Sequence, residues 1–284
     1  MKASRQPADR IAPPWLWPNL LGLDAPAVAV CWQWIFTRSF GINLPSVIYL
    51  VLALSAWTIY LADRLLDVFR SAPNELATER HRFTRKHSGK LIVLLILAAT
   101  LDLTLIIRFV PKILAITGCV TAALLGIYYL IRLGFTGKIG TLIPREVLCG
   151  MLFALGSAIG PHAFAPESLN EFDYFLPVVF FGLVCSASCI LISIWECDAD
   201  IASNDPSFAS SRSRLIPHIS TVLSGLVFIS AALAFFESSQ ILLATALSAL
   251  ALRITLHFEQ QLSRPLLRAL ADALLLTPLV FLLF

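Results

Sequence analysis

SVIYLVLALSAWTIYLADRLLDVF, residues 46–69, is an apolar run that carries two aspartates, Asp63 and Asp67, near its end. An α-helix crosses the hydrocarbon core of a bilayer with roughly 20 residues, and this run is long enough to do so. The stretch therefore predicts a membrane-spanning helix with a charged end.

The whole chain shares this apolar character. Of its 284 residues, 58% are hydrophobic and 14% are charged, and the mean hydropathy is +0.81. Soluble globular domains average about 45–50% apolar and about 25% charged residues, which excludes a water-soluble enzyme of this size. The six cysteines lie in apolar runs or at the end of one, without the loop spacings of a disulfide framework. The net charge of +3 gives no support to nucleic-acid binding.

Apolar runs and their breakers divide the chain into nine predicted helices. They cover residues 23–41, 46–69, 89–109, 112–133, 143–164, 174–196, 214–236, 239–257 and 266–284. We therefore predict an all-α polytopic membrane protein, a bundle of nine transmembrane helices around a central cavity. Residues 1–21, which contain four prolines and no apolar core of a signal peptide, form a cytoplasmic amino-terminal segment. Residues 22–284 form a single membrane domain.

Lysines and arginines are unevenly distributed between alternate loops. Most of them lie in the amino-terminal segment and in the loops after the second, fourth, sixth and eighth predicted helices. The opposite loops offer only Arg38, Arg108 and Lys112. Because cytoplasmic loops carry an excess of Lys and Arg, the amino terminus is predicted to be cytoplasmic. We expect an integral multi-pass protein of a bacterial inner membrane.

Two acidic pairs interrupt this apolar pattern on the predicted cytoplasmic side. Asp63 and Asp67 stand four residues apart, as do Glu196 and Asp200, with Asp198 between the latter two. Residues four apart share one face of a helix, and a carboxylate at membrane depth costs roughly 2.5–3.5 kcal/mol. Mg²⁺ binds carboxylate oxygens together with substrate phosphates, so two facing pairs predict a site for a metal-bound diphosphate.

A plainer interpretation of the same residues stays open at this point. Asp63 can form an ion pair with Arg64 or Arg70, and the acidic residues of 196–200 can be a solvated helix end. Neither arrangement requires a bound metal ion or diphosphate.

The order of these features resembles the UbiA superfamily of intramembrane prenyltransferases, as a divergent member. The first motif of that family is Asn-xxx-Asp-xxx-Asp, and Asp63 and Asp67 match its aspartates while Ile59 stands at the asparagine position. The second motif is Asp-xxx-Asp, which Glu196 and Asp200 match with one Glu for Asp. A basic loop follows the first motif here as it does in the family, although residues 79–87 differ from the family's usual arginine-rich pattern.

The resemblance implies a function and roles for these residues. Asp63, Asp67, Glu196 and Asp200 would be catalytic metal ligands for Mg²⁺. The diphosphate of the donor would be bound by basic residues after the second and fourth helices, with Asp198 as a further substrate-binding candidate; the basic residues are Arg82, Lys86 and Lys138. The implied partners are an isoprenyl diphosphate, a hydrophobic acceptor, aromatic or lipid, and the lipid bilayer, with no nucleic acid.

Two other functions are compatible with the sequence. The first is a non-catalytic UbiA-like protein, or a carrier of lipids or small molecules. The second is a proton- or ion-coupled transporter, which requires Asp102 or Asp272 to lie beside a central broken helix. Within residues 143–164, Gly150, Gly156 and Gly160 predict a small-residue face for close helix packing.

Overall fold

The computed structural model describes residues 13–70, 78–134, 144–202 and 212–283, in which the regular elements are helices. Within them, the side chains of residues 70, 125, 127–134, 197–202 and 212–217 lie outside the described set. The elements are η1 (Pro14–Leu16), α1 (Trp17–Leu21), α2 (Asp24–Ser39), α3 (Ser46–Arg70), α4 (Glu79–Lys86), α5 (Ser88–Phe109), α6 (Lys112–Gly134), α7 (Arg145–Ala163), α8 (Glu171–Ala202), α9 (Arg212–Glu237), α10 (Gln240–His257), η5 (Glu259–Gln261), α11 (Arg264–Ala273) and η6 (Thr277–Leu283).

The all-α, membrane-type architecture is confirmed, and the predicted number of spans is only partly reached. Within the described residues, six helices are long and apolar enough to cross a membrane, or up to eight if each of two bent helix pairs is one span. The described apolar part of α6, Lys112–Leu124, is shorter than a span. Two of the predicted spans, the first and the last, are broken; α6 extends to Gly134, beyond the part whose side chains are described throughout.

The first bent pair joins η1–α1 to α2 at an angle of 82°, and the second joins α11 to η6 at 51°. The first bend follows from Gly22, which ends α1 with φ of 69°, a left-handed conformation that favours glycine. Arg64 of α3 stabilises the same bend, because its guanidinium donates to the carbonyls of Asn19 and Leu20 at the end of α1.

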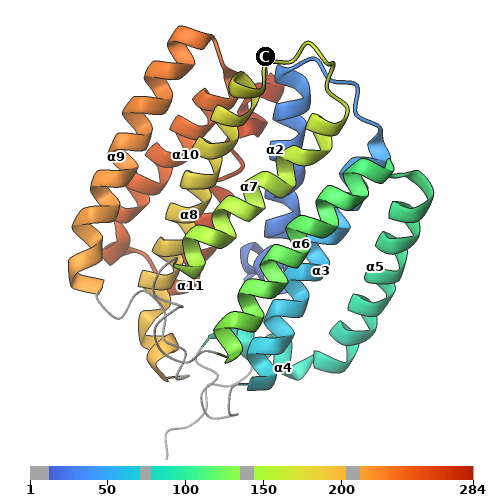
Figure 1. The fold of residues 1–284 in the computed structure, drawn as a ribbon. Helices are drawn as coiled ribbons and strands as arrows, with labels where there is room; N and C mark the ends of the chain where they lie inside the picture. The colour runs from blue at the N-terminus through green and yellow to red at the C-terminus, as the bar shows by residue number, and fades with distance from the viewer. Residues whose placement is uncertain (1–12, 71–77, 135–143, 203–211, 284) are drawn as a thin grey trace, which may run out of the picture.

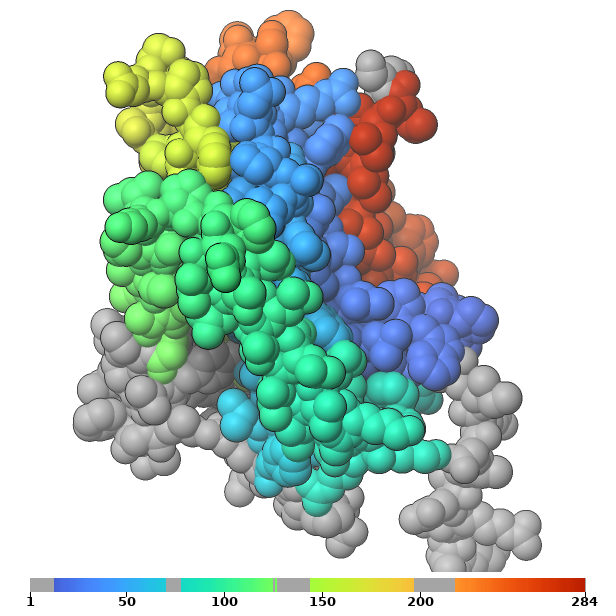
Figure 2. Space-filling model, turned by 90° about the vertical axis from the view of Figure 1, so that its right-hand side faces the viewer, coloured from blue at the N-terminus to red at the C-terminus, as the bar shows by residue number. Residues whose placement is uncertain are grey.

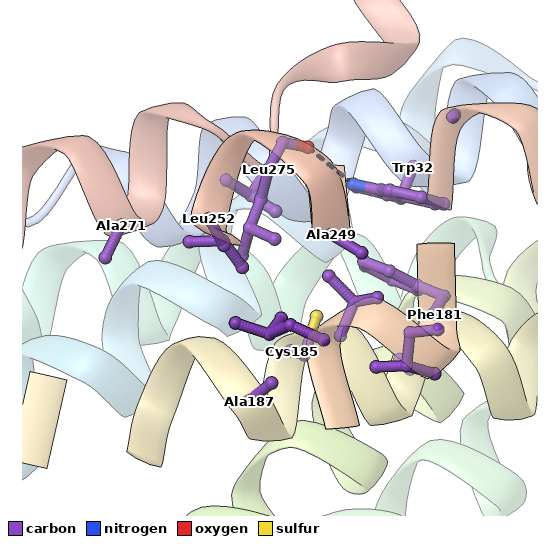
Figure 3. Packing of buried hydrophobic residues seen from close by; sticks show 14 of the residues in the cluster. Trp32, Phe181, Cys185, Ala187, Ala249, Leu252, Ala271 and Leu275 are labelled. Carbon is purple, nitrogen blue, oxygen red and sulfur yellow. Dashed lines mark hydrogen bonds between the residues drawn. The ribbon is translucent and has the colours of Figure 1, made fainter. Parts of the chain in front are cut away.

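The main core is formed where α2, α8, α10 and α11 meet (Figure 3). Trp32 of α2 is fully buried and stacks on Phe181 of α8, with ring centroids 3.7 Å apart. Its indole nitrogen donates to the carbonyl of Leu275 at 2.7 Å, just after the end of α11. This hydrogen bond satisfies both the indole and a carbonyl at the second bend.

Helix α7 approaches α8 and α2 closely at two of the three predicted glycine positions. A Cβ atom at Gly150 would clash with the backbone nitrogen of Ser186 on α8. One at Gly160 would clash with the side chain of Gln33 on α2. At Gly156, however, a Cβ atom would meet nothing within 4 Å, so this position does not contribute to the close contact.

Large apolar side chains cover the outside of the bundle. Ile107 of α5 and Phe228 of α9 are each more than 70% exposed, and Phe235 and Phe236 more than 80%. Figure 2 shows one such outer face, formed by α5 and the beginning of α6. Exposed apolar surface of this extent indicates contact with lipid.

Candidate functional site

The two predicted acidic motifs lie at one end of the bundle, beside α4. Asp63 and Asp67 occupy the last two turns of α3, and Glu196 lies near the end of α8. Arg268 of α11 connects these helices: its Nη1 donates to Glu196 Oε2 at 2.7 Å, and its Nη2 to the hydroxyl of Tyr60 on α3 at 3.4 Å. We call this region the α4 end; the turn between α9 and α10 lies at the opposite end (Figure 1).

Glu196 is held by two arginines. Besides Arg268, Arg80 of α4 approaches Glu196 Oε2 at 3.5 Å, and all three side chains are no more than 15% exposed. The interpretation of Glu196 as part of a solvated helix end is therefore wrong. Removing one partner from such a buried pair leaves an uncompensated charge, so the three side chains stabilise one another.

Asp63 forms an ion pair with Arg145, the first residue of α7, at 3.4 Å. The plainer alternative of a pair with Arg64 is wrong, because Arg64 points to α1 and is only 3% exposed. Its guanidinium also lies over the ring of Tyr60, 4.7 Å from the centroid. Arg64 thus has a structural role, and Asp63 of the first acidic motif is paired from α7.

Glu146, the second residue of α7, contacts α8 and not α3. It is only 7% exposed, and its Oε1 accepts a hydrogen bond from Ser193 of α8 at 3.1 Å. Arg145 and Glu146 therefore connect α7 to α3 and to α8, respectively. In the sequence, Arg145 and Glu146 look like an ordinary helix start after Pro144. The indication of their further role is that two charged residues stand directly beside an apolar span.

The diphosphate-binding role of the three predicted basic residues stays a prediction. Arg82 and Lys86 are exposed on α4, and Lys138 lies outside the described residues. Instead, Arg80 of α4 reaches Glu196, and Arg85 donates to the carbonyl of Val68 at 2.6 Å, which fixes α4 to the end of α3. Asp198 and Asp200 belong to α8, but their side chains are outside the described set.

His81, which follows Arg80 on α4, faces the same charges. Burial, assisted by the positive charge of Arg80 and partly opposed by Glu196, lowers the pKa of His81 to about 4. Its imidazole is therefore neutral at pH 7, so it adds a hydrogen-bonding group to the α4 end without adding charge.

Two further acidic residues lie within the bundle. Asp272 of α11 lies within electrostatic reach of Asp24, the first residue of α2 after the 82° bend. Asn19 of α1 donates to the same Asp24 carboxylate at 2.7 Å. Asp272 itself belongs to the second bent pair, α11–η6, and the transporter alternative stays a prediction. Asp102 instead accepts a hydrogen bond from Ser55 at 2.6 Å and joins α5 to α3.

Among the residues that the structure describes, no group of three or more His, Cys, Asp or Glu side chains is arranged to hold a metal ion. No protein-family model, curated protein or solved structure matches the chain. The fold and the site together define an all-α protein of membrane type, with a network of buried ion pairs at its α4 end.

Proposed function

We propose that this protein is a UbiA-like intramembrane prenyltransferase, which transfers an isoprenyl group from an isoprenyl diphosphate to a hydrophobic acceptor with Mg²⁺. If each bent pair is one span and α6 is another, the protein would have nine spans, the number expected around a central cavity. The α4 end then faces the cytoplasm of a bacterium, with the amino terminus on the same side. The observation that carries the proposal is the meeting of the acidic ends of α3 and α8 around Arg268.

The basic side of the α4 end is suited to bind a diphosphate. In the described part of the chain, the Nε atoms of Arg80 and Arg268 are buried and have no hydrogen-bond partner. Nη2 of Arg80 and Nη1 of Arg268 both approach the carboxylate of Glu196, while Nη2 of Arg268 donates to Tyr60. Arginine is the side chain that binds phosphate oxygens most specifically, and a phosphate oxygen would satisfy these unused donors.

The acidic side is suited to hold the Mg²⁺ that would accompany this diphosphate. Asp63 and Asp67 supply carboxylate oxygens, the ligands that Mg²⁺ prefers, and lie one helical turn apart. The 3.4 Å separation of Asp63 from Arg145 is long for a charge-assisted hydrogen bond, so a cation can replace this contact. When bound, Mg²⁺ supplies positive charge that stabilises the departing diphosphate.

The chain's own residues provide the remaining requirements of the reaction. Arg80 and Arg268 hold the diphosphate at the α4 end. The isoprenyl chain would extend from there into the apolar interior of the bundle, where water is scarce. Exclusion of water protects an allylic carbocation until the acceptor attacks its carbon.

Binding of a donor analogue tests this proposal. The purified full chain should bind the thiolo analogue of farnesyl diphosphate in the presence of Mg²⁺ and release it when EDTA is added. Asp63→Asn and Asp67→Asn should each weaken binding. Glu171→Gln is the matched control, because Glu171 begins α8 at the opposite end and pairs with His162. Binding that ignores both Mg²⁺ and the aspartate substitutions would overturn the proposal.

A second candidate function is a non-catalytic protein or a carrier of lipids or small molecules. It is favoured by the same ion pairs, because Asp63 and Glu196 already have cationic partners in the structure. In that case the acidic residues stabilise the bundle, and their substitution should lower stability without affecting a metal-dependent ligand. The analogue experiment therefore separates the two functions.

A further inference from the structure

A polar cavity lies at the end of the bundle opposite to the α4 end. Its volume of about 460 Å³ falls in the range of about 300–1,000 Å³ that is typical of ligand sites. Its walls come from the end of α2, the first turn of α8 and the turn between α9 and α10, and most of the lining residues are polar or charged. The proposed function places no group in this cavity.

Charges of both signs line the cavity. Arg38 lies in the last turn of α2, Asp173 in the first turn of α8 and Glu237 at the end of α9. In the part of the chain that the structure describes, no ion pair joins Arg38 to either carboxylate. A ligand with an anionic and a cationic group matches this arrangement, because the guanidinium attracts the former and the carboxylates the latter.

The guanidinium of Arg38 is fixed in position but retains unused donors. Its Nη1 donates to the carbonyl of Phe281 in η6 at 2.7 Å, and its central carbon lies 5.4 Å from the ring centroid of Trp34. An arginine has five N–H donors, and one such hydrogen bond leaves the others available. Planar guanidinium groups are well suited to bind phosphate oxygens.

The turn that carries Glu237 is also fixed. The next residue, Ser238, has φ of 52°, a left-handed conformation that is uncommon for a residue other than glycine. The amide nitrogen of Ser239 donates to the carbonyl of Ala234 at 3.1 Å, which closes the end of α9 in the manner of a Schellman motif. The acidic wall of the cavity is therefore formed before any ligand binds.

Exposed aromatic residues indicate that the ligand is a lipid. Phe172 directly precedes Asp173, and Phe236 directly precedes Glu237. Their side chains are 66% and 81% exposed, and they belong to the apolar outer surface of the bundle. A phospholipid can place its headgroup in the polar cavity and its acyl chains along this surface, whereas a soluble zwitterion would gain nothing from the exposed rings.

We propose that this cavity binds the headgroup of a zwitterionic phospholipid that carries a primary ammonium group. Arg38 binds the phosphate, and Asp173 and Glu237 accept hydrogen bonds from the ammonium. A quaternary ammonium has no N–H donor for these carboxylates, so an ethanolamine headgroup is preferred over a choline headgroup. The inference does not depend on the proposed function, because the diphosphate site lies at the other end of the bundle.

Native mass spectrometry of the full chain, released from detergent, tests this site. The protein is titrated with phosphatidylethanolamine or with phosphatidylcholine of the same acyl chains. The wild-type protein should bind the first lipid at least about tenfold more tightly, because hydrogen bonds to charged groups separate the two. Arg38→Gln should weaken the binding of both lipids, whereas Asp173→Asn and Glu237→Gln should each reduce the preference for phosphatidylethanolamine.

Two matched controls lie close to these positions without lining the cavity. Glu171 is in the same first turn of α8 as Asp173, but it pairs with His162. Arg108 is in the last turn of α5, which ends on the same side of the bundle as α2. Glu171→Gln and Arg108→Gln should therefore keep the wild-type affinities for both lipids.

Each outcome decides the inference. Equal wild-type affinities for the two lipids would overturn it, as would an unchanged preference in Asp173→Asn and Glu237→Gln. Competition by free phosphoethanolamine at the same concentration as the lipid would overturn the assignment to a lipid. Arg38→Gln also releases the carbonyl of Phe281, but the two acidic residues are exposed and lose no such contact, so their variants test the site if Arg38→Gln does not fold. Lipid preference in a protein that does not bind the donor analogue would disprove only the prenyltransferase proposal.

Discussion

Arg268 and Glu196 are 72 positions apart in the chain, yet Nη1 of the arginine lies 2.7 Å from Oε2 of the glutamate. The pair joins α11 to the end of α8, and the second nitrogen of Arg268 continues to Tyr60 on α3. One guanidinium thus connects three helices at the α4 end. Whether this connection is structural or functional can be separated by exchanging the charges.

We expect Arg268→Glu and Glu196→Arg each to lower the free energy of unfolding by about 3 kcal/mol, because each leaves buried like charges in contact. The double exchange should recover a large part of this loss. Unfolding of the purified variants in mixed micelles gives the stabilities. If the α4 end binds a diphosphate, the double variant should still fail to bind the donor analogue, since the cationic and anionic groups are displaced.

Recovery of both stability and analogue binding in the double variant would contradict a role of this pair in recognition. It would leave only the structural connection between α8 and α11.

The contact between α7 and α8 gives a prediction with an internal control. Gly150→Ala should destabilise the protein by about 1–3 kcal/mol, because the new Cβ atom clashes with the backbone of Ser186, which cannot move without shifting α8. Gly156→Ala, six residues along the same helix, should be neutral or stabilising by up to about 1 kcal/mol, since its Cβ atom meets open space. Unfolding in mixed micelles compares the two, and equal effects would contradict the packing described.

Acidification should destabilise the protein through His81. The folded-state pKa is about 4, below the ordinary value of 6.5, so the unfolded chain binds more protons between these values. The contribution of His81 is therefore fully present above pH 6.5 and is lost as the pH falls toward 4. Melting temperatures of the wild-type protein and His81→Gln should converge or cross over this range. A constant difference between pH 7 and 4.5 would show that His81 does not titrate as described.

Much of the helical pattern was predictable from the sequence, because the length of an apolar run depends on local composition. The predicted helix at 46–69 and α3, for example, differ by one residue at one end. The site was less predictable, because its contacts join distant parts of the chain. Arg145 and Asp63 are 82 positions apart, and no local pattern announces their pairing.

Helical geometry explains why the contact of Arg80 with Glu196 could not be predicted. The sequence shows a basic segment after α3, but it does not define which side of a short polar helix faces the bundle. Arg80 and Arg82 are two residues apart and therefore point about 200° apart around the helix axis. Arg80 contacts Glu196, whereas Arg82 is exposed. The choice depends on the attachment of Arg85 to Val68, a tertiary contact.

The attachment of the amino-terminal bend to α3 provides the last prediction. Arg64 donates to two carbonyls at the end of α1, and its planar guanidinium also lies over Tyr60. Lysine has a single point charge and cannot make this set of contacts, so Arg64→Lys should release α1 although the charge is kept. Amide hydrogen exchange of Trp17–Leu21 should become at least about tenfold faster, a change of about 1.4 kcal/mol in local stability, while exchange in the α7–α8 core should remain slow. Unchanged protection of α1 would show that the bend is held by Gly22 and its neighbours without Arg64.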